Sequence, residues 1–260
     1  MKKNEIENSE ILKLREKGMS FPKIARALGT SRELVRERMK RIGILKSVPD
    51  HNPLANFKYS YNYDFFNKID TQEKAYILGI LYADGNNFSK YKKRISIGLH
   101  KNDKELLEKI SQILNSNRPL QYSQNSYILH ISGKNISEQL TNLGCVPQKS
   151  LILKFPTEEQ VPRELHSHFI RGYFDGDGCI SYGKCYRVVA ILGTEDFIQG
   201  VKYCLEENGI PSKISKVKNI FILRIYSKDN IKSFHDYIYK NANIFMERKN
   251  NKFIEYFKTL

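Results

Sequence analysis

Two stretches of nine residues in this chain end in the same dipeptide, Asp-Gly. Residues 77–85 read ILGILYADG and residues 170–178 read IRGYFDGDG, so Asp84 and Asp177 are equivalent at an offset of 177 − 84 = 93 residues. If each stretch is a helix, its acid lies at the C-terminal end, where the helix already carries partial negative charge. If the two helix ends meet, the two carboxylates repel each other, and a divalent cation bound between them removes this repulsion. Because the ligands are oxygens, we expect Mg²⁺.

Small residues line one face of each expected helix. They are four residues apart, which places them on the same side of a helix: Gly79 and Ala83 in the first stretch, Gly172 and Gly176 in the second. Such faces let two helix backbones approach closely, so both C-terminal ends and both acids should come together. We expect Gly85 and Gly178 to end the helices in the left-handed conformation and to lead into strands.

The duplication extends beyond these two stretches. Matching segments follow in the same order: residues 94–99 and 187–192, Asp103 and Asp196, the helical patterns 104–114 and 196–208, and, one residue later in offset, residues 127–132 and 221–226. Each copy reads helix, two strands, helix, two strands, helix. This order predicts an α+β fold built as a pseudo-twofold pair of αββαββα units. Alternation in the strand that contains Ile95 and Ile97 leaves Arg94 and Ser96 on an open, basic face.

The first 45 residues predict three short helices. The first ends at Gly18, the second begins after Ser20, and the third follows a capping box formed by Thr30 and Glu33. The exposed side of the third helix is basic and carries Arg32, Arg36 and Lys40, with Arg38 close by. This pattern is typical of a helix-turn-helix domain that binds DNA, and the alternative is a helical packing module without DNA contacts.

Residues 45–64 show neither helical nor strand periodicity and contain Pro49 and Pro53. The aromatic residues at the end of this stretch could lie along a DNA backbone or pack on the following domain. The predicted organisation is therefore a helix-turn-helix domain (1–45), a linker (46–69), a first repeat (70–162) and a second repeat (163–260).

Charge and cysteine usage restrict the class of protein. Forty-three Lys and Arg residues against 28 Asp and Glu give a formal net charge of +15, which favours a polyanionic partner, nucleic acid first. No apolar run approaches the roughly 20 residues of a membrane-spanning helix, and the first ten residues are too polar for a secretory signal. The four cysteines form no Cys-x-x-Cys pair, so we expect reduced thiols in an intracellular protein, in the cytoplasm, the nucleoid or an organelle.

The two nine-residue stretches resemble the paired signature of the LAGLIDADG homing endonucleases in their single-chain form. The resemblance covers about residues 70–260 and includes residues 144–150 and 154–156 between the repeats. Two positions depart from the family pattern. Tyr82 stands where the signature has its earlier Asp, and Arg171 replaces a small residue. Both later acids, Asp84 and Asp177, are present.

The resemblance implies a site-specific double-strand DNA endonuclease that hydrolyses one phosphodiester per strand with a divalent metal. It implies that the main-chain carbonyls of Ala83 and Gly176 join Asp84 and Asp177 in holding the metal. Family position suggests Lys149 and Lys249 as basic residues that assist catalysis. His100 corresponds to a polar residue that organises solvent; its counterpart by the repeat offset is Gly193, so the two sites should be unequal.

The resemblance also implies that two sheets lie in the DNA major groove and that one chain acts as a monomer with internal pseudo-twofold symmetry. The partner is double-stranded DNA, and no membrane is involved. The residues expected to contact DNA are Arg32, Arg36, Arg38, Lys40, Lys90, Lys92, Lys93, Arg94, Ser96, His130, Lys184, Arg187 and Arg224.

Two alternatives on the same scaffold stay open: a DNA-binding regulator that has lost cleavage, and an intron RNA maturase. The two retained acids argue against the regulator, because repelling carboxylates do nothing for a pure binder. Self-splicing is not expected, because the chain starts at Met1 without a Cys or Ser nucleophile and ends without a His-Asn pair.

Overall fold

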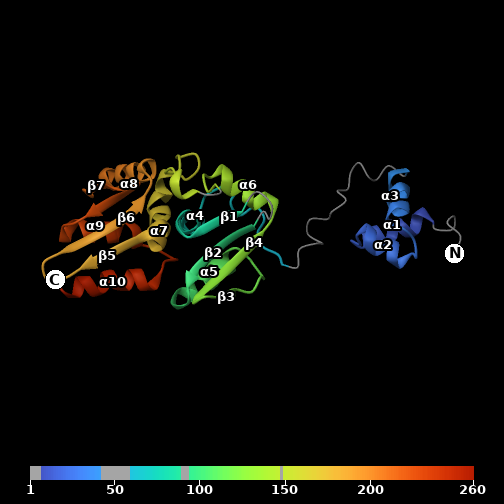
Figure 1. Ribbon diagram of the computed structural model, residues 1–260, viewed down its shortest axis with the longest axis horizontal. Coiled ribbons are helices and arrows are strands. Elements are labelled where there is room, and N and C mark those ends of the chain that lie inside the picture. Colours follow the sequence, from blue (N-terminus) through green and yellow to red (C-terminus); the bar gives the residue numbers. More distant parts are fainter. Residues whose placement is uncertain (1–6, 42–58, 89–93, 147–148) are drawn as a thin grey trace. The chain divides into compact units, whose positions relative to one another are not determined.

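The computed structural model describes residues 7–41, 59–88, 94–146 and 149–260 (Figure 1). The chain divides into two compact units, Met1–Ser60 and Tyr61–Leu260. Three expected DNA contacts, Lys90, Lys92 and Lys93, lie outside the described residues, as does the side chain of Lys40. Within the described ranges, no helix is both long and apolar enough to cross a membrane.

The smaller unit consists of three helices, α1 (Asn8–Glu16), α2 (Phe21–Ala27) and α3 (Arg32–Arg41). They share a small apolar core made by Ile11, Phe21, Ile24, Ala25, Val35 and Met39. Gly18 has a φ of +77°, as expected for a residue that ends a helix. The start of α3 differs from the prediction by one residue: Leu34 N–H donates to Ser31 Oγ at 3.1 Å, so the hydroxyl that caps α3 belongs to Ser31 and not to Thr30.

The larger unit contains the two expected repeats (Figure 1). The first comprises α4 (Gln72–Ala83), β1 (Gly85–Phe88), β2 (Arg94–His100), α5 (Lys104–Ile113), β3 (Gln121–Ser123), β4 (Ser126–Ser132) and α6 (Lys134–Asn142). The second comprises α7 (His166–Asp177), β5 (Gly178–Tyr182), β6 (Arg187–Gly193), α8 (Glu195–Glu207), β7 (Lys213–Val217), β8 (Ile220–Ile225) and α9 (Lys228–Tyr239). A further helix, α10 (Glu247–Lys258), follows. The αββαββα order is confirmed, and both sheets are antiparallel, with orders β1-β2-β4-β3 and β5-β6-β8-β7.

Helices α4 and α7 pack against each other at the junction of the two repeats (Figure 1). A Cβ atom on Gly79 would overlap the carbonyl oxygen of Phe169, and one on Gly172 would overlap that of Tyr76. Close approach of the two backbones therefore requires glycine at both positions. The prediction that Gly85 and Gly178 adopt the left-handed conformation was wrong. Neither has a positive φ; both begin strands, and a side chain there would collide with the preceding helical turn.

The strand registers correct the repeat offset. Gly85 pairs with Ile97 in the first repeat and Gly178 pairs with Ile191 in the second, so the second hairpin holds one more residue. From β2 onward the offset is therefore 191 − 97 = 94. A slip of one residue would turn the buried Ile191 to the other face of the sheet, which the core does not allow. Thr194, and not Gly193, is thus the counterpart of His100.

Residues 61–69 belong to the fold of the larger unit, so the predicted linker (46–69) was too long at its end. Tyr61 donates its hydroxyl to Ser132 O at 3.2 Å, and the backbone N–H of Phe66 donates to Gln139 Oε1 at 3.2 Å. Phe65, Phe66 and Ile69 are buried in the main core. The aromatic side chains that interrupted the expected linker are there because they pack on the first repeat.

Candidate active site

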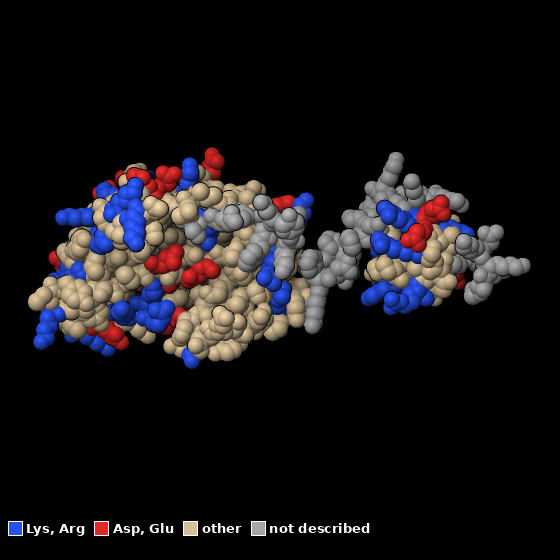
Figure 2. Space-filling model, viewed as in Figure 1, with Lys and Arg blue, Asp and Glu red and all other residues tan. Residues whose placement is uncertain are grey.

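The ends of α4 and α7 bring the two predicted acids together. Asp84 directly follows α4, and Asp177 is the last residue of α7. A Cβ built on Gly176 would lie 3.0 Å from Asp84 Oδ2 and would overlap the side chain of Ala83. The carboxylate of one repeat therefore lies against the helix end of the other. Figure 2 shows acidic residues gathered in the middle of one face of the larger unit, with Lys and Arg on both sides.

Asp84 and Asp177 are both exposed to solvent, yet the pKa of each carboxyl group is raised. Partial desolvation at the crowded helix ends, and then the charge of Asp177, raises the pKa of Asp84 to about 6. Partial desolvation also raises the pKa of Asp177. The surroundings thus oppose ionisation of both carboxylates, which is the condition that a bound cation relieves.

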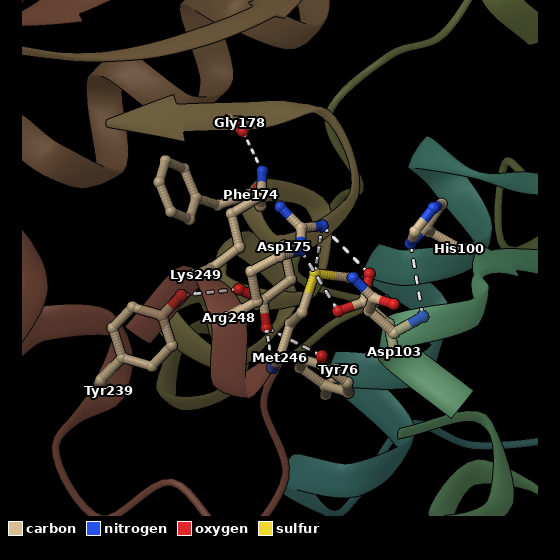
Figure 3. A network of polar contacts seen from close by, with 11 residues as sticks. Tyr76, His100, Asp103, Phe174, Asp175, Gly178, Tyr239, Met246, Arg248 and Lys249 are labelled. Carbon is tan, nitrogen blue, oxygen red and sulfur yellow. Dashed lines mark hydrogen bonds and ion pairs between the residues drawn. The ribbon is translucent and has the colours of Figure 1, made fainter. Parts of the chain in front are cut away.

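Two buried lysines, Lys149 and Lys249, hold the helix ends. Lys149 Nζ donates to Gly85 O at 2.6 Å and to Ala83 O at 3.5 Å. Lys249 Nζ donates to Phe174 O at 3.2 Å and to Gly178 O (Figure 3). An ammonium group at a helix C-terminus offsets the partial negative charge of the last carbonyls. Burial lowers the pKa of Lys249, because the charged ammonium group loses contact with water.

Each candidate centre combines groups from both repeats. One pocket is lined by Ala83, Lys149 and Asp177, together with Gly193 and Thr194. On the opposite side, Asp84 lies against Gly176, and among the nearby cations Lys249 opposes the raised pKa of Asp84 more than Lys149 does. An acid of one helix, the end of the other helix and one lysine therefore make up each centre.

The donor set fits a hard divalent cation. Each centre offers a carboxylate beside the last backbone carbonyls of the opposing helix, and oxygen donors are what Mg²⁺ prefers. The described residues contain no group of three or more His, Cys, Asp or Glu that could hold a metal. Such a sparse protein shell is compatible with Mg²⁺, which keeps several waters and is completed by substrate phosphates.

His100 plays a local structural part in this structure. Its Nδ1 accepts from the backbone N–H of Asn102 at 3.3 Å and so caps the 3₁₀ turn Lys101–Asp103 (η2). Its counterpart Thr194 caps α8 by accepting from the backbone N–H of Phe197, and it lines the pocket that contains Asp177. Thr194 is therefore a candidate site residue that the sequence analysis missed, because the extra hairpin residue hid the equivalence.

The open faces of the two sheets carry only part of the predicted DNA contacts. Ser96 lies opposite His130, and Arg94 lies opposite Ser132, on the face away from the buried Ile95. His130 is itself buried, with Nε2 3.1 Å from Gln121 Oε1, and burial lowers its pKa.

The second sheet differs from the prediction at one arginine. Arg224 lies on its open face, opposite Ala190, and donates to Ser215 Oγ. Arg187 was predicted to correspond to Arg94, but it pairs with Tyr182 and is in register with the buried Val189, so it lies toward the helices at the strand end. The shift in offset explains this difference.

The remaining predicted contacts are at the periphery. Lys184 is exposed in the turn between β5 and β6. In the smaller unit, Arg32 and Arg36 are exposed on α3, whereas Arg38 is half-buried and Nη1 donates to Asn8 Oδ1 at 3.4 Å.

Comparison with known proteins agrees with this fold. Residues 164–239, which span the second repeat from the start of α7 to the end of α9, match the family described as LAGLIDADG-like domain. The second repeat is therefore similar to LAGLIDADG-like domains. A crystal structure of the I-LtrWI LAGLIDADG homing endonuclease bound to target DNA shares the fold, with a TM-score of 0.50 at 12% identity, over 76% of this chain and 92% of that chain.

Two curated relatives come from Methanocaldococcus jannaschii. The probable translation initiation factor IF-2 is 27% identical over 69% of this chain, and the DNA-directed RNA polymerase subunit Rpo1C is 28% identical over 80%. The chain spans only 16% and 22% of the length of these two proteins.

Proposed function

We propose that this protein is a site-specific double-strand DNA endonuclease of the LAGLIDADG homing type. The observation that carries the proposal is the meeting of Asp84 and Asp177 at the ends of α4 and α7, each against the other helix. A protein that only binds DNA gains nothing from two carboxylates that repel each other and also repel phosphate. Their presence supports a metal-dependent reaction on the phosphate backbone.

In this proposal Asp84 and Asp177, with the carbonyls of Ala83 and Gly176, would hold Mg²⁺. The metal, when bound, would supply a Lewis acid for the phosphate and would make the attacking water more acidic. Lys149 and Lys249 place a positive charge beside each centre, where negative charge develops on the phosphate in the transition state.

DNA binding in this proposal rests on the net charge and on the open sheet faces. Ser96 and Arg94 in the first sheet and Arg224 in the second are placed to face a DNA groove. The helix-turn-helix unit would add phosphate contacts through Arg32 and Arg36. One chain contains both centres, so we propose that it acts as a monomer.

The test is the selection of cleaved sites from a randomised duplex library with the full chain and Mg²⁺. We expect the sequenced ends to define one long site that is cut on both strands. Enrichment of bound but uncut duplexes, in Mg²⁺ and in Mn²⁺, would favour a non-cleaving regulator. Tighter binding of structured intron RNA than of duplex DNA would favour an RNA maturase.

A further inference from the structure

The two sides of the α4–α7 helix pair have different chemistry although the repeats are equivalent. On one side, aromatic rings pack: the centroids of Tyr82 and Phe169 are 5.0 Å apart, and those of Phe169 and Phe197 are 6.3 Å apart. On the other side, two buried acids occupy the corresponding places. The equivalent pairs are Tyr82 and Asp175 (175 − 82 = 93), Phe169 and Tyr76 (169 − 76 = 93), and Phe197 and Asp103 (197 − 103 = 94).

The buried carboxylate of Asp175 fixes the start of α10. It accepts from Tyr239 Oη at 2.6 Å, from Tyr76 Oη at 2.8 Å and from the backbone N–H of Met246 at 2.7 Å (Figure 3). Met246 is the N-cap residue of α10, so a carboxylate here also lies at the favourable, positive end of that helix. The first turn of α10 is thereby attached to α7.

A second acid attaches the same turn to the first repeat. Arg248 Nε and Nη2 donate to Asp103 Oδ1 and Oδ2 at 3.3 and 3.0 Å, and Asp103 is only 6% exposed. A two-pronged arginine–carboxylate pair with one buried partner has a defined geometry. The pair of Lys154 and Asp196, at 3.6 Å, has no such constraint, because both of its side chains are exposed.

Lys249, the next residue along α10, reaches the end of α7 (Figure 3). The anchored turn therefore holds a lysine at the end of α7, which is the helix end against which Asp84 lies. Lys149 comes from the 3₁₀ turn Lys149–Leu151 (η3) beside the aromatic side of the helix pair. Among the residues that the structure describes, no ion pair joins this turn to either repeat.

We propose that Arg248, through its ion pair with Asp103, is a positioning residue for Lys249, so that cleavage of the strand beside Asp84 depends on this pair and cleavage of the other strand does not. The part about cleavage rests on the proposed function; the part about position does not. Loss of the pair should therefore turn a double-strand endonuclease into an enzyme that accumulates nicked DNA.

The position of Lys249 is tested without DNA by trace acetylation of lysine amines and mass spectrometry of the peptides. Lys149 and Lys249 are 9% and 8% exposed, so both should react slowly in the wild type. In Arg248→Met we expect Lys249 to react about tenfold faster, as for a contact worth ~1.4 kcal/mol, with Lys149 unchanged. Arg248→Lys should restore part of the protection, and Lys154→Met, which breaks the exposed pair, should change neither lysine.

The single variant leaves Asp103 buried and unpaired, which could unfold the protein. The double variant Asp103→Asn, Arg248→Met removes both charges and should give the same pattern in a folded chain. Unchanged reactivity of Lys249 in both variants, or an equal rise at Lys149, would overturn the positioning role.

Cleavage is then measured under single-turnover conditions on a duplex labelled on each strand in turn. We expect both variants to cut one strand about ten to a hundredfold more slowly, as for a misplaced catalytic group, and the other within about twofold. Equal slowing of both strands contradicts the proposal. If the wild type cuts neither strand, the proposed endonuclease function fails, while the acetylation result still decides whether Arg248 positions Lys249.

Discussion

At the scale of single residues, the chemistry depends on groups that are costly in the isolated protein. Asp84 and Asp177 meet at the C-terminal ends of two helices, where the backbone carbonyls carry partial negative charge. Lys149 and Lys249 donate to these carbonyls and offset that charge. Two carboxylates arranged this way destabilise the metal-free fold, and a bound cation removes the repulsion between them.

Asp84→Asn and Asp177→Asn should each abolish double-strand cleavage. The loss should be at least about a hundredfold, since a metal ligand worth several kcal/mol in the transition state is removed. Binding to the selected DNA site should persist or tighten, because a carboxylate facing phosphate is lost. Plasmid linearisation and gel shift measure the two effects. Asp196→Asn, an exposed acid outside the site, is the control, and wild-type cutting of both strands by both site variants would refute the catalytic assignment.

The same substitution should stabilise the metal-free protein. The folded pKa of Asp84, about 6, lies above its ordinary value of 3.8, so the ionised acid destabilises the fold above pH 6 and the effect vanishes below pH 3.8. Because solvent screens the exposed side chain, we expect the substitution to raise the free energy of unfolding by ~1 kcal/mol, or the Tm by about 2–4 °C.

Thermal unfolding of Asp84→Asn and the wild type at pH 7.5 and pH 5, with and without Mg²⁺, measures this effect. The gain in Tm should be larger at pH 7.5, and Mg²⁺ should raise the Tm of the wild type more than that of the variant. A variant that is less stable than the metal-free wild type at pH 7.5 would contradict the electrostatic explanation.

At the scale of elements, the close contact of α4 with α7 is set by two glycines. Gly79→Ala or Gly172→Ala should destabilise the fold by about 1–3 kcal/mol or more, because each new methyl group meets a backbone carbonyl that cannot move aside. Alanine is the better helix former by about 1 kcal/mol, so a loss of stability would isolate the packing term.

Urea unfolding measures that loss. Gly98→Ala is the matched control, since its Cβ would have only an ordinary contact of 3.8 Å with Ile128 Cγ1. Two helix variants as stable as the wild type would show that the backbones do not approach as closely as described.

The local patterns of the sequence were enough to predict the elements but not every equivalence between the repeats. Periodicity placed the strand faces of Ile95 and Ile97 and the order of both repeats, because these depend on neighbours in sequence. The extra residue in the second hairpin left that pattern intact and shifted only the register, so Thr194 was missed. The pairing of Asp103 with Arg248 joins residues 145 positions apart, and no local signal specifies it.

Helix α10 was also absent from the predicted order. Its signal was present in the sequence, since Phe253, Tyr256 and Phe257 recur at helical spacing and pack on the core. What could not be read is that Asp175, the earlier acid of the second nine-residue stretch, accepts the backbone N–H at the start of this helix. Tyr82 occupies the equivalent position in the first stretch. It packs against the ring of Phe169 and does not hold the start of a helix as Asp175 does.

At the scale of the whole molecule, two separate apolar cores allow the two units to be considered as separate folding units. The acids and both buried lysines belong to residues 61–260, whereas the smaller unit contributes exposed arginines on α3. The smaller unit should therefore affect how tightly DNA is held and not where it is cut.

Deletion of residues 1–45 should weaken DNA binding at physiological salt and shorten the protected DNA on one flank of the site. It should also reduce the slope of log K against log salt by about 0.9 for each lost phosphate contact. The cleavage position should not move, because Asp84 and Asp177 are retained. Footprinting and a salt titration of affinity measure these effects. In the full chain, Arg32→Ala and Arg36→Ala should each reproduce about one contact's share of the slope, while Glu37→Ala on the same helix should not lower it. A deleted protein with an unchanged footprint and salt slope would show that the three helices serve another partner.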